Sequence, residues 1–163
     1  MSKINWFVLI RAFTYATLFI GIVLIYVPAN ILSWVGIVRP SSIEWFQIAG
    51  IMIGVVGAAI ALWCILTFAL IGKGTPAPFD PPRQLVIRGP YRFVRNPMYI
   101  GAGMTLAGAA LFYESLVLLV YTGIFFLATH LFVIGYEEPT LRQTFGQVYE
   151  TYCRQVRRWW PAF

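Results

Sequence analysis

Long apolar runs separated by short polar connections dominate this chain. Four runs stand out, covering residues 6–27, 45–71, 98–112 and 116–136. A hydrocarbon core about 30 Å thick is crossed by about 20 helical residues, so each run is a candidate span and the third is short. The pattern predicts an all-α, polytopic membrane bundle of four transmembrane helices, with residues 1–163 forming a single membrane domain.

The residues after Pro139 follow a different pattern, in which apolar and aromatic side chains recur at helical spacing. Seven of them fall within an arc of about 100° at 3.6 residues per turn: Leu141, Phe145, Val148, Tyr149, Tyr152, Val156 and Trp159. The pattern predicts a cytoplasmic amphipathic C-terminal helix that lies against the preceding loop or along the lipid headgroups.

Composition agrees with a membrane protein and narrows the partners. Hydrophobic residues make up 60% of the chain and charged residues 11%, which excludes an ordinary soluble domain. The net charge of +6 is spread between the apolar runs and does not form one basic face, so lipid or an acidic ligand is favoured over nucleic acid. With two cysteines and one histidine, no disulfide framework or Cys/His metal site is expected.

The positive charges also predict orientation. Arg39 alone falls on one side of the predicted spans, and eleven basic residues fall on the other: Lys3, Arg11, Lys73, Arg83, Arg88, Arg92, Arg95, Arg142, Arg154, Arg157 and Arg158. Because cytoplasmic loops carry the excess of Lys and Arg, both termini are predicted to be cytoplasmic. The loop 73–96 and the tail after Tyr136 then share one membrane face, so their residues can meet.

Small residues in the second and third runs predict where helices approach closely. Helices in lipid associate through Gly and Ala, which let their backbones touch. The predicted contact residues are Gly50, Gly54 and Ala58 on the second run and Gly101, Gly103 and Gly108 on the third.

The segment that leads into the third run carries the chemistry. Residues 84–99 hold three arginines and two tyrosines, with Gly89-Pro90 and Asn96-Pro97 as paired breakers. A helix that starts at Pro97 leaves backbone amides exposed at its positive end, which suits a carboxylate or a ring nitrogen. The alternative interpretation is a basic cytoplasmic loop with interfacial aromatics.

Two acids, Glu137 and Glu138, follow the fourth run, where the helix dipole disfavours anions. They either face the arginine-rich loop as ion pairs or contact a ligand. His130 lies seven positions before Glu137, roughly on the same face of an α-helix. An ionisable group in an apolar run is a candidate functional residue, although a neutral histidine bonded to a neighbouring helix is the structural alternative.

With these residues in view, the segment from Arg83 to Trp160 resembles the isoprenylcysteine carboxyl methyltransferase and phospholipid methyltransferase family of integral membrane enzymes. The resemblance is carried by the following residues, in this order: Leu85-Val86, Gly89-Pro90-Tyr91, Val94-Arg95-Asn96-Pro97, Tyr99, Glu137-Glu138, Leu141, Phe145-Gly146, Tyr149 and Tyr152.

The resemblance implies S-adenosyl-L-methionine as cofactor, held within residues 73–163 without a Rossmann domain. Carried over by motif, the cofactor-binding residues are Arg83, Gln84, Leu85, Val86, Tyr91, Asn96, Pro97, Met98, Tyr99 and Glu137. The chain departs from the family in two places. Asn96 stands where many relatives have His, and Val133 stands where eukaryotic prenylcysteine enzymes have a substrate arginine.

The reaction makes few demands on the protein, because a sulfonium methyl is already activated and must only be attacked in line. A carboxylate acceptor needs no base, and Arg95 is the first choice to fix it. An amine or thiol must lose a proton, which would bring in His130 or a glutamate.

The expected function is methyl transfer to a lipophilic acceptor in the membrane, most directly carboxyl O-methylation of an isoprenylcysteine-like substrate. Phospholipid amine N-methylation is the alternative reaction. The alternative from another class is a non-enzymatic protein that binds anionic lipid or a partner through its basic loop and its Gly50/Gly54 face. The sequence leaves the acceptor and the oligomeric state open.

Overall fold

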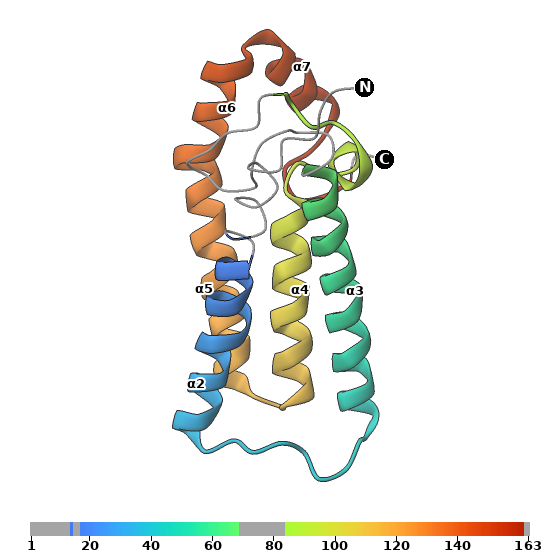
Figure 1. Ribbon diagram of the computed structural model, residues 1–163, viewed down its shortest axis with the longest axis vertical. Coiled ribbons are helices and arrows are strands. Elements are labelled where there is room, and N and C mark those ends of the chain that lie inside the picture. The colour runs from blue at the N-terminus through green and yellow to red at the C-terminus, as the bar shows by residue number, and fades with distance from the viewer. Residues whose placement is uncertain (1–13, 15–16, 69–83, 162–163) are drawn as a thin grey trace. The chain divides into compact units, whose positions relative to one another are not determined.

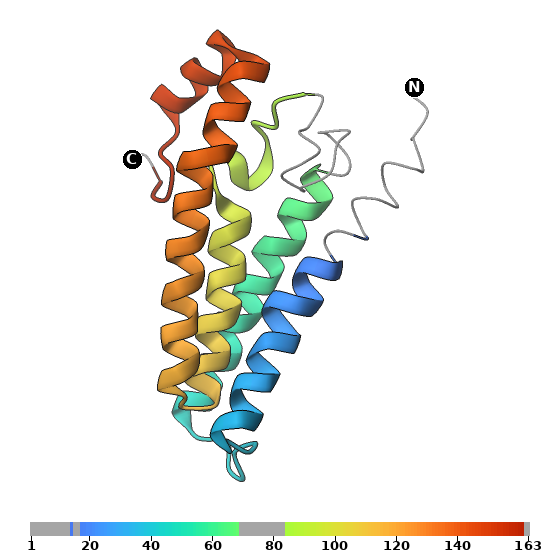
Figure 2. The same cartoon turned by 90° about the vertical axis from the view of Figure 1, so that its left-hand side faces the viewer.

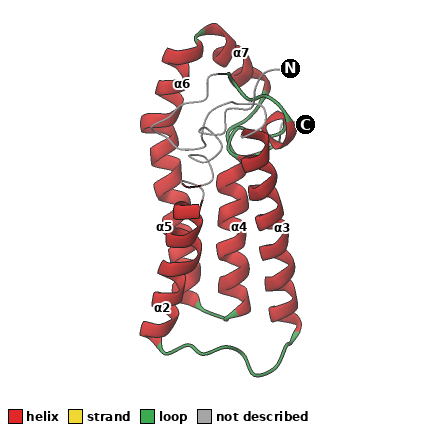
Figure 3. Cartoon of the chain, in the orientation of Figure 1, coloured by secondary structure: helices red, strands yellow, loops and turns green. Residues whose placement is uncertain are grey.

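The computed structural model describes residues 14, 17–68 and 84–161. Within these residues the chain forms helices and connecting segments and no strand (Figure 3). Contacts divide the chain into two compact units. The span unit comprises Phe19–Ala61 and Met98–Leu131, and the tail unit comprises Leu62–Pro97 and Phe132–Phe163 together with Met1–Leu18.

The apolar runs form helices, labelled in Figure 1. They are a π-helix, Ile20–Tyr26, followed by α2 (Val27–Val35), α3 (Trp45–Thr67), α4 (Pro97–Phe112) and α5 (Leu116–Phe132). Three continuous helices are long and apolar enough to cross a membrane, Thr17–Val35, Trp45–Thr67 and Leu116–Phe145, and α4 is shorter. Side chains such as Ile51 and Leu119 are exposed, as a lipid-facing surface requires. These features are those of an integral membrane protein.

The first apolar helix ends later than the sequence predicts. We expected it to stop at Val27, before Pro28, and this was wrong because the helix continues to Val35. Pro28 lies in the first turn of α2, directly after the π-helix, a position where proline is tolerated. The helix ends at Gly36, whose φ of 74° lets its N–H reach the carbonyls of Leu32 and Ser33. The predicted start at residue 6 and the end of the second span at residue 71 lie outside the described residues.

Glycines bring α3 and α4 into backbone contact within the span unit, where Figure 2 shows the two helices side by side. A Cβ on Gly108 would lie 2.5 Å from the Gly50 carbonyl oxygen, and one on Gly57 would lie 2.6 Å from the Gly101 carbonyl oxygen. The predicted contact is therefore confirmed for Gly50, Gly54, Gly101 and Gly108, whereas Gly103 lies against Phe126 of α5. Ala58 is exposed, so Gly57 takes the place that we had assigned to it.

An apolar cluster completes the span unit. Ala102 and Leu106 of α4 are buried with Phe125 of α5. The hydroxyl of Tyr121 donates a hydrogen bond to the Val23 carbonyl at 3.0 Å, which connects α5 to the first apolar helix. The packing of this unit therefore uses small residues together with part-buried hydrogen bonds between helices, as expected of helices in lipid.

In the tail unit the last long helix continues beyond its apolar part. After α5 it passes through a π-helix, Val133–Glu137, into α6, Glu138–Phe145. The continuous helix of 30 residues has a length of about 45 Å, which exceeds a hydrocarbon core of about 30 Å. The charged α6 therefore extends past the span that we predicted for residues 116–136.

The C-terminal amphipathic segment forms two helices where we predicted one. Gly146 has a φ of 51° and separates α6 from α7, Gln147–Gln155. An L side chain rarely adopts this conformation, and it ends α6, so the 3.6-residue period does not continue across it. The predicted apolar face is nevertheless buried at Tyr149, Tyr152 and Val156, whereas Val148 is exposed.

Candidate functional site

The turn that leads into α4 depends on a glycine. It contains the short 3-10 helix η3, Gly89–Arg92, and Gly89 has a φ of 58°. A Cβ at Gly89 would lie 3.1 Å from Thr67 Oγ1 and 3.3 Å from Trp63 Nε1, so the absence of a side chain permits this close approach. Tyr91, next to Pro90, is buried and packs edge-on against Phe68 with ring centroids 5.1 Å apart.

The loop and the C-terminal tail meet in the tail unit, as the predicted orientation requires. The Arg95 N–H donates to the Arg157 carbonyl at 3.0 Å, and Asn96 Nδ2 donates to the Arg158 carbonyl at 3.3 Å. The hydroxyl of Tyr152 donates to the backbone carbonyl of Tyr91. Three separate contacts therefore tie the segment before α4 to the segment after α6.

A buried carboxylate lies at the centre of this junction. Glu138 Oε1 is 2.7 Å from Arg158 Nε and 3.1 Å from Arg95 Nη1, and Glu138 Oε2 accepts from Arg158 Nη2 at 2.9 Å. Arg142, one helical turn along α6, reaches Oε2 at 3.4 Å. The Glu138 side chain is 3% exposed and that of Arg95 is 12% exposed, so the charges are desolvated and depend on one another. The opposite-charge pairing between loop and acids is thus confirmed for Glu138.

The arginines keep Glu138 ionised. Burial acts to raise the pKa of this carboxyl group, but the hydrogen bond from Arg158 and the charges of Arg95, Arg158 and Arg142 outweigh it and lower the pKa below its ordinary value. Burial also raises the pKa of the Tyr152 hydroxyl, so this group stays protonated and donates. The junction is therefore a fixed anion held by cations at neutral pH.

Arg95 has a buried donor without a hydrogen-bond partner. Its Nη1 contacts both Glu138 and the sulfur of Cys153, the latter at 2.7 Å. Among the buried side-chain nitrogens and oxygens of the described residues, Arg95 Nε alone lacks a hydrogen-bond partner. A buried N–H without an acceptor is unfavourable, so this atom is a candidate contact for a bound oxygen.

The residues predicted to bind cofactor are divided between the two units. Arg83 lies outside the described residues. The tail unit contains Gln84, Leu85, Val86, Tyr91, Asn96, Pro97 and Glu137, and the span unit contains Met98 and Tyr99.

Their environments within each unit differ. Gln84 is exposed, whereas Val86, Tyr91 and Asn96 are buried. Leu85 packs against the cluster of Tyr149, Tyr152 and Val156. In the span unit Tyr99 packs against the cluster that includes Ala102 and Phe125, and Met98 is half-buried. Of the tail-unit members, Leu85, Tyr91 and Asn96 contact the C-terminal segment at the loop–tail junction.

His130, the second predicted catalytic residue, lies in the span unit and is half-buried on α5. We expected His130 and Glu137 to share one helical face, which assumes a uniform 3.6 residues per turn. This assumption does not hold, because Val133–Glu137 is π-helical. A π-helix has more residues per turn, and such segments are frequent at functional sites.

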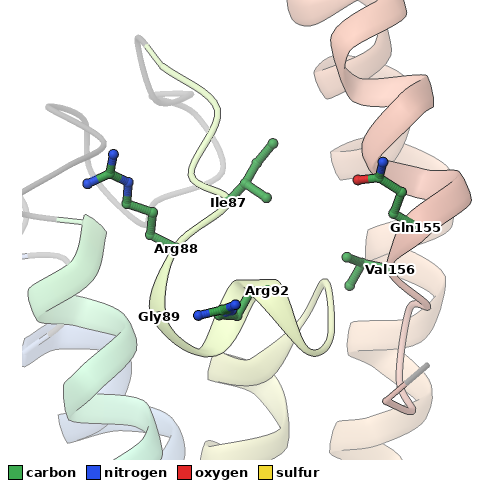
Figure 4. Close-up of a pocket in the computed structure, with 6 residues that line it drawn as sticks. All are labelled: Ile87, Arg88, Gly89, Arg92, Gln155 and Val156. Atoms are coloured by element: carbon green, nitrogen blue, oxygen red, sulfur yellow. The ribbon is translucent and has the colours of Figure 1, made fainter. Parts of the chain in front are cut away.

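A cavity of about 600 Å³ lies beside the junction, within the tail unit (Figure 4). Its lining residues were not among those predicted from the sequence: Ile87, Arg88, Gly89, Arg92, Gln155 and Val156. The sequence feature that could have indicated this cavity is the pair of arginines, Arg88 and Arg92, on either side of Gly89-Pro90. Among the described residues no three His, Cys, Asp or Glu side chains gather as metal ligands.

The fold and the junction describe an α-helical membrane protein with a charged, polar site in its tail unit. The family model for phospholipid methyltransferases matches residues 45–148, from the start of α3 into α7. The chain belongs to the phospholipid methyltransferase family. No curated protein and no solved structure matches it.

Membership makes the protein a membrane methyltransferase, and methyltransferases of this family generally take the methyl group from S-adenosyl-L-methionine. The matched residues include both the turn before α4 and the acids Glu137 and Glu138. Membership of this family also implies that the substrates are lipids or lipophilic molecules.

Proposed function

We propose that this protein transfers the methyl group of S-adenosyl-L-methionine to a lipophilic acceptor in the membrane. The observation that carries the proposal is the ion pair between Arg95 and Glu138, which joins the turn before α4 to the acid pair inside the matched region. The family resemblance implies cofactor contacts on both of these segments, which supports the proposal.

The residues of the junction fit such a cofactor. S-adenosyl-L-methionine carries a carboxylate and a cationic sulfonium centre. Glu137 is a half-buried carboxylate, which suits the cationic centre, whereas the buried donor Arg95 Nε is kept for the carboxylate of the acceptor. When bound, the cofactor would supply an already activated methyl group.

We assign cofactor binding to the residues that match the family motif: Arg83, Gln84, Leu85, Val86, Tyr91, Asn96, Pro97, Met98, Tyr99 and Glu137. Asn96 takes the place of a common histidine, and its amide already donates to the Arg158 carbonyl. Its proposed role is therefore to fix the turn so that neighbouring backbone groups face the cofactor.

For the acceptor, we propose carboxyl O-methylation of an isoprenylcysteine-like substrate. A carboxylate is ionised at neutral pH and needs no base, so the task of the protein is to position it. The described part of the tail unit has seven arginines and three glutamates, an excess that favours an anionic acceptor. Arg95 is the proposed positioning group, acting from its fixed place beside Glu138.

Phospholipid amine N-methylation is the second candidate, and the description of the matching family favours it. An amine must lose a proton during the reaction, and His130 is the proposed base in that case. The two reactions therefore differ in whether the variant His130→Ala loses turnover.

The proposed topology has four transmembrane helices, with α4 as the short one and both termini in the cytoplasm. The basic residues 88, 92, 95, 142, 154, 157 and 158 support this orientation through the excess of Arg on cytoplasmic segments. The C-terminal helices then lie on the side from which a charged cofactor arrives.

Calorimetric titration of the full-length protein with S-adenosylhomocysteine tests the proposal. Saturable binding is expected in the wild type and should be lost in Glu137→Ala and Tyr99→Ala. Glu150→Ala is the matched control, because Glu150 forms an exposed ion pair with Arg142 and is not among the residues predicted to bind the cofactor. Absence of heat with folded wild-type protein would instead favour the non-enzymatic alternative, binding of anionic lipid or of a partner.

Transfer of a radiolabelled methyl group then distinguishes the acceptors. N-acetyl-S-farnesylcysteine and phosphatidylethanolamine are supplied separately to the protein in nanodiscs. Label in the farnesylcysteine ester supports the first reaction, and label in the lipid amine supports the second. If neither is labelled while S-adenosylhomocysteine binds, both acceptor assignments are wrong.

A further inference from the structure

The end of α3 carries an exposed apolar surface. Leu62, Trp63 and Leu66 lie in its last two turns and are exposed, and α3 is long and apolar enough to cross a membrane. Exposed apolar side chains on such a helix face lipid. Because tryptophan is enriched where acyl chains meet headgroups, Trp63 indicates that α3 reaches this boundary here.

The turn before α4 packs against the same part of α3, within the tail unit. A Cβ at Gly89 would lie 3.1 Å from Thr67 Oγ1 and 3.3 Å from Trp63 Nε1, and Tyr91 packs edge-on against Phe68. Thr67 is the last residue of α3. The turn therefore lies beside the final apolar residues of α3 and shares their depth in the membrane.

The exposed side chains of this turn are those of a membrane interface. Arg88 and Arg92 are exposed and form no ion pair with any residue that the structure describes. In Figure 4 the Arg88 side chain extends away from Gln155 and from the Arg92 guanidinium, so each arginine can take a partner of its own. Arg92 lies over the ring of Phe93, 5.7 Å from its centroid, and Phe93 is 58% exposed. An aromatic ring beside long cationic side chains that reach the headgroups is typical of an interfacial anchor.

The backbone of the turn is suited to this position. Irregular backbone is tolerated at membrane depth only where its polar groups are paired. The amides of Phe93 and Val94 donate to the Pro90 carbonyl at 3.1 and 3.4 Å, and Pro90 has no amide hydrogen. The Arg95 amide donates to the Arg157 carbonyl. Internal hydrogen bonds therefore satisfy these amides without water.

We infer that residues 88–93 form a lipid-contact surface, which lies at the boundary between the acyl chains and the headgroups of one leaflet. Phe93 contacts the upper acyl chains, and Arg88 and Arg92 each bind a separate lipid phosphate. Anionic phospholipids are the preferred partner, because no described carboxylate neutralises these two arginines. The inference goes beyond the proposed function, since it involves neither the methyl donor nor the acceptor, and the two fail independently.

Fluorescence quenching in nanodiscs measures this contact. Phe93→Cys is made in the Cys153→Ser background and labelled with a nitrobenzoxadiazole fluorophore, since the remaining Cys64 is fully buried. A nitroxide on the upper acyl chain of the lipid should quench this label several-fold more than aqueous iodide does. Val148→Cys is the matched control, because Val148 is 60% exposed against 58% for Phe93 but lies on α7. Its label should be quenched mainly by iodide, and iodide-dominated quenching at position 93 as well would overturn the inference.

Oxidation by hydroxyl radicals generated in water tests the unsubstituted protein in the same nanodiscs. Phenylalanine reacts faster than valine with this radical, so Phe93 would be oxidised more than Val148 if both faced water. The inference predicts the reverse order. Oxidation of Phe93 above that of Val148 would overturn it, even if the labelled variants did not fold.

The role of the two arginines is tested with nitroxide lipids of two kinds, phosphatidylglycerol and phosphatidylcholine. At equal mole fraction, the anionic lipid should quench the label at position 93 more strongly. R88Q/R92Q should reduce this preference by up to about fivefold for each arginine, the factor that corresponds to about 1 kcal/mol per cation near an anionic leaflet. Arg154→Gln, which removes an exposed arginine of α7, should leave the preference unchanged. Equal quenching by the two lipids, or an equal loss in Arg154→Gln, would overturn the assignment of lipid phosphates to Arg88 and Arg92.

Discussion

Replacing Glu138 by glutamine removes the one negative charge that Arg95 and Arg158 share. The carboxylate lies 3.1 Å from Arg95 Nη1 and 2.7 Å from Arg158 Nε, and its side chain is 3% exposed. Glutamine has nearly the same shape, so the change leaves two cations close together in a poorly solvated place. Removing one partner of a buried pair destabilises a protein by about 3–5 kcal/mol.

That loss should be local, because Glu138 connects the loop before α4 with the tail after α7. At about 1.4 kcal/mol per factor of ten, the tail unit should open about 10²- to 4 × 10³-fold more often in Glu138→Gln. Hydrogen exchange of peptides from residues 90–97 and 150–158 measures this opening directly. These peptides include the Arg95 amide, which donates to the Arg157 carbonyl.

Glu150→Gln is the control for loss of a carboxylate. Glu150 pairs with Arg142 at 2.9 Å, but both side chains are more than 40% exposed, at 41% and 45%. Exposed pairs contribute about 0–1 kcal/mol, so exchange should change little. If Glu138→Gln increased exchange no more than Glu150→Gln, the buried network would not hold the junction together and the reasoning would be refuted.

Three further predictions concern packing, a single hydrogen bond and pH. Gly108→Ala should destabilise the span unit by about 1–3 kcal/mol through overpacking, seen as a lower temperature of aggregation in detergent. Gly123→Ala, with open space around it, should not, and equal effects would contradict the proposed glycine contact. Tyr152→Phe leaves the Tyr91 carbonyl without its donor and should increase hydrogen exchange in the tail unit by the equivalent of about 1–3 kcal/mol, whereas unchanged exchange would show that the bond is not formed. Because the pKa of Glu138 is lowered in the folded protein, its stabilisation is complete above its ordinary pKa of 4.5 and is lost as the pH falls through the folded value. The difference in pepsin sensitivity between wild type and Glu138→Gln should therefore shrink on acidification below about pH 4.5, and a constant difference would contradict the ion-pair explanation.

The helices were predictable because their signal is local. Apolar length alone located the runs that became α3, α4 and α5, and the glycine spacing indicated that α3 and α4 touch. The predicted helix boundaries were wrong where the local backbone geometry differs from the regular repeat of 3.6 residues per turn. Pro28 follows a π-helix without ending the first apolar helix, and Gly146 turns a predicted single helix into two.

The segments that form the candidate site could be predicted from the sequence, but not which residues of those segments pair with one another. The arginine turn and the acid pair could be located from sequence, and charge predicted that they would meet. Which acid is buried depends on helical phase, and the π-helix Val133–Glu137 changes the winding immediately before Glu138. The cavity residues Gln155 and Val156 come from the end of α7, and their approach to the Gly89 turn is a tertiary contact that no local pattern encodes.

The contact between the Arg95 amide and the Arg157 carbonyl has a consequence for how this protein is produced and modified. Because main-chain atoms form this hydrogen bond, many side chains at position 157 are compatible with it. The bond nevertheless requires that residue 157 be present. A stop codon or protease cut before Arg158 would remove a counter-ion of Glu138 from a helix 20 residues away. Expression variants and affinity tags should therefore preserve Arg157 and Arg158, since removing them would break contacts in the interior of the enzyme and not merely on its surface.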